Sequence, residues 1–257
     1  MSGVFRVGGE AYDDFMGRYS ARLAAPFADF FGAHGRVLDV GAGTGMLTRE
    51  LLDRGCDVTA AEPSPEFCGV LRARFPAVDV VETPAEQLPF ADGAFDAAAA
   101  QLVVAFMADA PQAVAEMARV ARTVAVCMWG VMEHEMFAAI QRTAAAVGGQ
   151  GEMSARRYRT PEELHDLLAP LGEVESAALD VTASYAGFDE FWGALEQQVG
   201  PAGAWLQALD GEQRVRARDE MSRQLGSPAG PFELRGRAYA ARVSTDARSA
   251  PVPTSDT

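Results

Sequence analysis

Lysine is missing from this chain, so all 22 of its basic side chains are arginines. Schiff-base chemistry, a lysine general base and a P-loop phosphate site each require an ammonium group that arginine does not replace. The sequence therefore excludes these three kinds of mechanism.

Cysteine is scarce, and Cys56, Cys68 and Cys127 form an odd-numbered set without C-x-x-C spacing. A disulfide framework needs paired cysteines, and a zinc site needs closely spaced ligands. We therefore expect three reduced, buried thiols and no metal site.

Basic residues are outnumbered by acidic ones, 22 against 36, which gives a formal net charge of −14. Such a charge repels polyphosphates and anionic surfaces, so nucleic acid and membranes are poor candidates as partners. The sequence also lacks a basic N-terminal segment followed by an apolar one, and no apolar run reaches spanning length. We expect a cytoplasmic protein, either a monomer or a homodimer, without membrane insertion.

The most informative feature that is present is a strand-like run, from Val37 to Leu47, that contains Gly41, Gly43 and Gly45. Because glycine has no Cβ, its backbone can adopt positive φ and approach a ligand at contact distance. The order G-x-G-x-G, followed by a methionine and no lysine, matches neither the G-x-G-x-x-G dinucleotide fingerprint nor a P-loop. The turn predicts a nucleotide-related ligand that is not held through a pyrophosphate.

Residues 33 to 128 alternate between short apolar runs and amphipathic segments, which is typical of a parallel, doubly wound sheet. Right-handed crossovers bring the strand ends, and with them the glycine turn, to one ligand-binding edge. The expected strands are 36–40, 57–61, 78–82, 95–100 and 123–128, and the expected helices are about 45–54, 65–74 and 111–122.

Helices are also expected on either side of this core. Residues 1–32 are predicted to form an N-terminal helical cap, in which Pro26 is a candidate break between two helices. Beyond the fifth strand, a helix is expected at about 134–147, and another begins at Thr160, where Thr160 and Glu163 form a capping box.

Two final strands, at 173–185 and 231–243, are expected to pair at one edge of the sheet. A helical insertion of about 187–225 separates them, with helical stretches expected at about 187–198 and 201–225. The domain map is then 1–32 for the cap, 33–243 for the main domain and 244–257 for a disordered tail.

Glu62 stands at the end of the second expected strand. A carboxylate there can accept hydrogen bonds from both hydroxyls of a ribose, as in other doubly wound nucleoside sites. The alternative is a solvated surface glutamate. The coincidence with the glycine turn favours ribose binding.

These features resemble class I S-adenosylmethionine-dependent methyltransferases, particularly the small-molecule group that includes the ubiquinone and menaquinone C-methyltransferases. The resemblance implies a mostly parallel seven-stranded sheet with an N-terminal helical lid and a helical insertion before the last, antiparallel strand. It covers roughly residues 10–183 and follows motifs at Val37 to Gly45, Glu62-Pro63-Ser64, Ala85 to Phe90 and Phe95-Asp96.

The resemblance also implies S-adenosylmethionine as the cofactor. One position departs from the family pattern, because Pro84 stands where an aspartate often binds the adenine amino group, so Glu86 or backbone carbonyls must accept that hydrogen bond. Carried over, the residues are Gly41, Ala42, Gly43 and Gly45 for the methionine end, Glu62 and Pro63 for the ribose, Ala85 and Glu86 for the adenine, and Gln101 near the methionyl amine.

The N-terminal segment resembles the lid of part of this family. Tyr12, Arg18 and Tyr19 are candidates to close over the cofactor, with Arg18 pairing with its carboxylate and an aromatic ring facing the sulfonium. The alternative is a plain packed N-terminal helix.

A small-molecule acceptor, methylated at O, N or C, is favoured by the segment Gln101-Leu102-Val103-Val104. It resembles neither the Asn/Asp-Pro-Pro-aromatic loop of enzymes that methylate amino groups of adenine or glutamine nor the cysteine-nucleophile RNA methylases. Methyl transfer from a sulfonium is an in-line displacement, so positioning can suffice without an obligatory catalytic residue. If a general base is used, His134 is the candidate, and a capping or surface histidine is the alternative.

Two further alternatives stay open. One is a non-catalytic S-adenosylmethionine-binding or regulatory protein on the same fold. The other is a nucleotide-dependent oxidoreductase, which Met46 within the glycine turn disfavours. Among the late aromatics, Phe188, Phe191, Trp192 and Trp205 either line an acceptor pocket or pack in the core.

Overall fold

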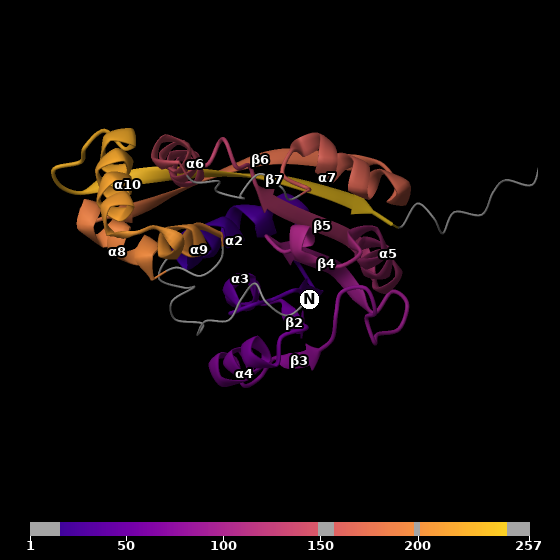
Figure 1. The fold of residues 1–257 in the computed structure, drawn as a ribbon. Helices are drawn as coiled ribbons and strands as arrows, with labels where there is room; N and C mark the ends of the chain where they lie inside the picture. Colours follow the sequence, from indigo (N-terminus) through magenta and orange to yellow (C-terminus); the bar gives the residue numbers. More distant parts are fainter. Residues whose placement is uncertain (1–15, 149–156, 198–200, 246–257) are drawn as a thin grey trace, which may run out of the picture.

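A seven-stranded sheet runs through residues 16–148, 157–197 and 201–245, which are the residues that the computed structural model describes (Figure 1). The strand order is β3-β2-β1-β4-β5-β7-β6, in which β7 is antiparallel to both of its neighbours and the other pairs are parallel. This confirms the doubly wound, mostly parallel sheet with its two last strands at one edge. The strands are β1 (Arg36–Val40), β2 (Asp57–Glu62), β3 (Asp79–Glu82), β4 (Phe95–Gln101), β5 (Ala121–Trp129), β6 (Val174–Tyr185) and β7 (Phe232–Ser244).

Helices cover both faces of this sheet, and those of the C-terminal insertion gather at one end of the molecule (Figure 1). Within the described residues, no helix is long and apolar enough to cross a membrane. The helices are α2 (Arg18–Phe31), α3 (Met46–Asp53), α4 (Pro65–Arg74), α5 (Ala110–Val120), α6 (Glu135–Val147), α7 (Pro161–Leu168), α8 (Phe188–Glu196), α9 (Pro201–Ala208) and α10 (Gly211–Gln224), with 3-10 turns η2 (Val104–Phe106) and η4 (Ala169–Leu171).

The central strands are apolar on both faces, because successive side chains of a strand point to opposite sides of the sheet. Val37 of β1 belongs to the core cluster that contains residues of α2, α3 and α6. Its neighbour Leu38 belongs to the other cluster, with residues of α5 and α7. A sheet that is covered on both faces explains why β1, β4 and β5 read as nearly continuous apolar runs.

The strand order reverses direction at β1, which lies between β2 and β4. In open α/β sheets, ligands bind beyond the carboxyl ends of the strands at such a switch point. Residues 41–45 follow β1 directly, so the glycine turn lies where the sequence predicted it.

The N-terminal helix α2 is continuous and contains Pro26, so the prediction of a break at this proline is wrong. Leu23 and Phe27, on either side of the proline, are both fully buried. The burial of one uninterrupted apolar stripe outweighs the backbone hydrogen bond that proline removes. Tyr12 and residues 246–257, which include most of the predicted tail, lie outside the described residues.

The stretch predicted as helical over 201–225 is divided into two helices, because α9 ends at Ala208 and α10 begins at Gly211. Asp210 accepts a hydrogen bond from the Gln213 backbone N–H at 2.8 Å, and the Gln213 side chain accepts one from the Asp210 N–H at 3.0 Å. This reciprocal capping box starts a new helix.

The capping box predicted at Thr160 and Glu163 forms only in part. The Thr160 hydroxyl accepts from the Glu163 N–H at 3.2 Å, but the Glu163 carboxylate accepts from the N–H of Arg159 at 2.8 Å instead of Thr160. The helix predicted over 111–122 ends at Val120, because Ala121 already pairs with β4 in the sheet.

The edge strand β6 is lined by arginines of α2. Arg18 donates a hydrogen bond to the carbonyl of Ser184 at 3.2 Å, and Arg22 donates one to the carbonyl of Thr182. The first helix of the described chain is thereby attached to one of its last strands.

Candidate active site

The glycine turn between β1 and α3 holds all three of its glycines at positive φ, at 69° for Gly41, 57° for Gly43 and 88° for Gly45. At Gly41 and Gly45, the missing side chain lets another residue pack directly against the turn. A Cβ at Gly41 would lie 2.6 Å from Val103 Cγ2, and one at Gly45 would lie 2.3 Å from Phe75 Cε2. The turn therefore packs directly against the segment that follows β4 and against the end of α4.

Gly43 is different, because a Cβ added there would meet no atom within 4 Å among the described residues. Its N–H donates a hydrogen bond to Glu62 Oε2 at 3.0 Å. The turn is thus open at Gly43, on the side where a side chain would project. The hydrogen bond to Glu62, on the neighbouring strand β2, fixes the backbone of Gly43.

Glu62 is the last residue of β2 and is almost fully buried. Its second oxygen, Oε1, accepts from the Ser64 N–H at 2.9 Å. Burial raises the pKa of Glu62, while these two backbone hydrogen bonds oppose the rise. Each carboxylate oxygen has two lone pairs, so each keeps one with which to accept a hydroxyl of a ligand.

Asp39 is a buried carboxylate close enough to Glu62 to feel its charge, and the sequence reasoning did not single it out. It lies inside β1, is almost fully buried and accepts a hydrogen bond from the Thr48 hydroxyl at 2.6 Å. Burial raises the pKa of Asp39 to about 7, and the charge of Glu62 adds to the rise. An aspartate between the apolar residues Leu38 and Val40 was the available signal, since buried carboxylates are rare unless they have a role.

The loop that follows β3 carries the residues predicted for the adenine. Ala85 is buried, and Pro63, at the end of β2, is exposed. The Glu86 carboxylate accepts from the Asp109 N–H at 3.0 Å, which ties this loop to the start of α5. Thr83 stabilises the loop internally by donating to the carbonyl of Gln87 at 2.7 Å.

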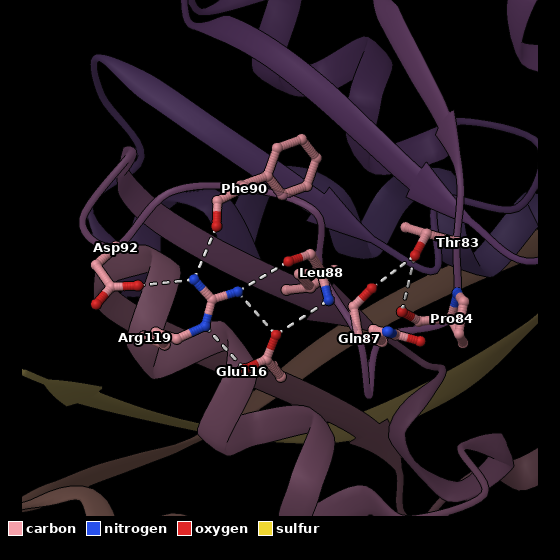
Figure 2. Close-up of polar contacts among 8 residues, drawn as sticks. All are labelled: Thr83, Pro84, Gln87, Leu88, Phe90, Asp92, Glu116 and Arg119. Atoms are coloured by element: carbon pink, nitrogen blue, oxygen red, sulfur yellow. Dashed lines mark hydrogen bonds and ion pairs between the residues drawn. The ribbon is translucent and has the colours of Figure 1, made fainter.

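Arg119 of α5 holds the second half of the same loop, as Figure 2 shows. Its guanidinium donates to the carbonyls of Leu88 and Phe90, at 2.8 and 2.7 Å, and to Asp92 Oδ1 at 2.8 Å. Glu116, one turn earlier on α5, accepts from Arg119 at 2.8 Å and from the Leu88 N–H at 3.1 Å. This loop is thus bound to α5 through four polar contacts, three from Arg119 and one from Glu116.

Gln101 ends β4, immediately beside the glycine turn. Its side-chain N–H donates to the Ser20 carbonyl of α2 at 2.9 Å. Its other atom, Oε1, is buried without a hydrogen-bond partner among the described residues. Leu102, the next residue, has a φ of 63°, which turns the chain sharply away from the strand.

His134 lies just after β5 and is fully buried. Its ring centroid is 4.6 Å from that of Tyr19, 5.0 Å from that of Trp129 and 4.3 Å from that of Phe137. Burial lowers its pKa to about 3, so the imidazole is neutral at pH 7. The interpretation of His134 as a surface residue is thereby excluded, and it also makes no capping hydrogen bond to α6.

The predicted lid residues are divided between the core and the C-terminal insertion. Arg18 pairs with Glu190 of α8 at 2.5 Å and lies over the ring of Tyr185, 5.2 Å from its centroid. Tyr19 is fully buried, and its hydroxyl accepts a hydrogen bond from the Tyr185 hydroxyl at 3.3 Å. The third lid residue, Tyr12, lies outside the described residues.

The structure therefore brings two groups together at the carboxyl ends of the parallel strands. Gly41 to Gly45 and Glu62 form one group at β1 and β2, and Gln101, His134 and Tyr19 form the other at β4, β5 and α2. No group of three or more histidine, cysteine, aspartate or glutamate side chains among the described residues could hold a metal ion. Cys56, Cys68 and Cys127 are free and buried.

Comparison with known proteins assigns this region to a described family. Residues 38–128 match the family model "Methyltransferase domain". An uncharacterized methyltransferase of Mycobacterium tuberculosis is 35% identical over 129 residues, which cover 49% of this chain and 52% of that protein. A demethylmenaquinone methyltransferase of Renibacterium salmoninarum is 39% identical over 87 residues, which cover 34% of this chain and 37% of that protein. The chain thus spans about half or less of the length of these curated relatives.

A solved structure from Anaeromyxobacter dehalogenans, named as a type II methyltransferase, has the same fold. Its TM-score is 0.64 at 21% sequence identity, and the match covers 88% of this chain and 96% of that one. This likeness in fold covers much more of the chain than the segment that the family model matches.

Proposed function

We propose that this chain, through its class I S-adenosylmethionine-dependent methyltransferase domain, transfers a methyl group to a small-molecule acceptor. Glu62 is the observation that carries the proposal. It is a buried carboxylate, fixed by the N–H groups of Gly43 and Ser64, at the sheet edge where a nucleoside binds in doubly wound folds.

The fold and family imply S-adenosylmethionine as the cofactor, and the residues of this site fit it. The open side of Gly43 leaves room for a ligand against the backbone, and Glu62 keeps lone pairs for ribose hydroxyls. When bound, the cofactor supplies a methyl group on a positively charged sulfonium. We assign the methionine end to Gly41, Ala42, Gly43 and Gly45, the ribose to Glu62 and Pro63, and the adenine side to Ala85 and Glu86.

The remaining residues of the site orient the two reactants. The amide of Gln101 is fixed by Ser20, which leaves Oε1 to accept a hydrogen bond from the amine of the cofactor. Arg119 and Glu116 hold the adenine-side loop in one conformation. Holding the acceptor in line with the sulfonium and excluding water provide the acceleration in a displacement of this type.

On the acceptor side we place His134 and Tyr19, both fully buried next to the end of β5. Arg18 and Tyr12 belong to the segment proposed to cover the site. The relatives reported above match only part of this chain, so we infer the acceptor of this chain from its own residues.

Glu62→Gln tests the cofactor site. The neutral amide loses charge-assisted hydrogen bonds, which are worth about 1.5–3 kcal/mol each, so we expect binding of S-adenosylhomocysteine to weaken by about tenfold or more. Isothermal titration measures this. Glu82→Gln is the matched control, because Glu82 is the exposed register partner of Glu62 on β3 and should leave the affinity unchanged.

Transfer itself is tested with S-adenosylmethionine that is labelled in its methyl group and a broad panel of small acceptors. Transfer to at least one acceptor, lost together with binding in Glu62→Gln, supports the proposal. Tight binding without any transfer would instead show a non-catalytic cofactor-binding protein, and no binding of S-adenosylhomocysteine by the unmodified chain would refute both.

A further inference from the structure

Several polar atoms on the acceptor side are buried without a hydrogen-bond partner among the described residues. Folded proteins leave very few such atoms, because each costs the free energy of its desolvation. A cluster of them marks a place where a ligand completes the hydrogen bonds. At the end of β5 these atoms are both ring nitrogens of His134 and Nε1 of the neighbouring Trp129.

His134 is the most demanding member of this cluster, because both of its nitrogens lack a partner. Its Nε2 faces the backbone of β7, where a Cβ added to Gly236 would lie 2.7 Å from it. A neutral imidazole has one N–H donor and one acceptor nitrogen. Because Nε2 packs against β7, Nδ1 is the nitrogen that remains for a ligand. A hydroxyl fits it in either tautomer, because a hydroxyl can both donate and accept a hydrogen bond.

The surroundings of His134 define the rest of the ligand. Tyr19, Trp129 and Phe137 contribute aromatic rings next to the imidazole, and the wider core cluster contains Phe191 and Trp192. Flat, apolar walls of this kind favour a ring or another planar apolar body.

The buried charged groups of the described residues lie in the cofactor half of the site, not beside His134. Among the described residues, the only fully or almost fully buried carboxylates are Asp39 and Glu62, both on the cofactor side, and no arginine is buried. Arg18 and Glu190, at the margin of the aromatic cluster, are partly exposed and neutralise each other. An anionic acceptor would find no buried counter-charge beside His134, and burying an unpaired ion is very costly.

We propose that the acceptor is an uncharged, planar apolar compound with a hydroxyl group, and that His134 is the positioning residue that binds this hydroxyl. The inference rests on the proposed methyl transfer, since it describes the acceptor of the same site. His134 then selects the acceptor by hydrogen bonding, and the aromatic rings orient it toward the cofactor side.

The test compares three probes with the full chain saturated with S-adenosylhomocysteine. The probes are 2-naphthol, naphthalene and 2-naphthoate, which share a ring system and differ in the hydroxyl and in charge. We expect the affinities to follow the order 2-naphthol, naphthalene, 2-naphthoate. In protein with ¹⁵N-labelled histidine, 2-naphthol should shift the ring resonances of His134 and leave those of His34 and His165 in place.

His134→Phe keeps an aromatic ring and removes both nitrogens. We expect it to weaken 2-naphthol binding by about tenfold, the equivalent of one hydrogen bond, and to leave naphthalene binding unchanged. His134→Gln, which keeps a donor and an acceptor, should restore part of the difference. Thermal unfolding shows whether each variant is folded, and His165→Phe, on the exposed side of α7, is the matched control.

The results separate this inference from the proposed function. Unchanged binding of S-adenosylhomocysteine in His134→Phe, with selective loss of 2-naphthol, supports the inference. Equal loss of 2-naphthol and naphthalene, preference for 2-naphthoate, failure of all three probes to bind, or unmoved His134 resonances would overturn it. A failure of the proposed function would appear separately, as absent cofactor binding in the unmodified chain.

Discussion

At the scale of single residues, the site combines carboxyl groups that burial keeps from ionising easily. Asp39 and Glu62 end or interrupt apolar strands, and burial is the first cause of the raised pKa of each. Desolvation disfavours the charged form of a carboxylate, and a second carboxylate nearby adds to the effect. The cofactor half of the site is therefore sensitive to pH in a range where ordinary carboxylates are already ionised.

Asp39→Asn tests this sensitivity. The folded chain binds the Asp39 proton up to a pKa of about 7, against an ordinary value of 3.8, so the unmodified protein loses stability as the pH rises between these two values. The slope expected from one proton is roughly 1.4 kcal/mol per pH unit. The variant lacks this proton, and its amide oxygen can still accept from Thr48.

Chemical denaturation at several pH values measures the difference. The free energy of unfolding of Asp39→Asn should rise relative to that of the unmodified chain between about pH 5 and 7. Asp79→Asn, at the exposed start of β3, should show no such relative change. A difference that is constant over this pH range would contradict the assignment.

At the scale of elements, the loop that follows β3, which we propose to lie on the adenine side, depends on a helix that is distant in sequence. Arg119 contacts two backbone carbonyls and two carboxylates, and it is partly shielded from solvent. Planar guanidinium groups make such forked contacts, and an ammonium group does not. The position of the loop is thus set by the side chain of α5 as well as by its own turn residues.

Arg119→Met should loosen the loop and cost about 1–2 kcal/mol of unfolding free energy, after allowance for partial exposure. Hydrogen exchange of the backbone amides in residues 83–93 should speed up, and Arg119→Lys should rescue little of the loss. Arg122→Met is the control, since the Arg122 side chain is mostly exposed and makes a longer ion pair of 3.9 Å. Unchanged hydrogen exchange of residues 83–93 in Arg119→Met would show that the loop keeps its conformation without Arg119.

Element boundaries show where sequence reasoning succeeds and where it fails. The glycine turn and Glu62 were predictable, because strand, turn and carboxylate follow one another locally and the chemistry constrains the spacing. Pro26 was misjudged because tertiary burial of Leu23 and Phe27 overrides a local helix breaker. The break at Asp210 was missed because its capping box lies within an otherwise helical pattern.

Other features of the site were not available from the sequence at all. Arg119 reaches residues 88 to 92, and Gln101 reaches Ser20, through contacts that no local pattern encodes. His134 was a candidate by its place after a strand. Its full burial and its lack of partners in the described part of the chain follow only from packing against Tyr19 and Trp129.

At the scale of the whole molecule, α2 joins the two halves of the chain. Its Asp29 pairs with Arg54, beyond α3, at 2.6 Å, and its Arg18 pairs with Glu190 of α8 at 2.5 Å. Tyr19, Leu23 and Phe27 are fully buried in the core that the sheet shares with α3 and α6. The segment that the sequence suggested as a separate cap therefore supplies part of the main core.

Removing residues 1–32 should abolish cooperative folding. Each large apolar side chain that leaves the core takes about 1.5–3 kcal/mol with it, and domains have only about 5–15 kcal/mol in total. Circular dichroism and calorimetry would show the loss. Removing residues 246–257, predicted to be disordered, should leave the unfolding temperature unchanged. A cooperative transition in the chain that starts at residue 33 would show that α2 is dispensable.

The arginines of α2 also affect whether copies of the molecule associate through the edge strand β6. An outer strand with free carbonyls invites another copy to add a strand and extend the sheet. Arg18 and Arg22 occupy the carbonyls of Ser184 and Thr182, near the end of β6. The side chains that attach the first helix to the sheet therefore also protect this stretch of the sheet edge from pairing with another copy. In this chain, which has no lysine, arginine alone can do so.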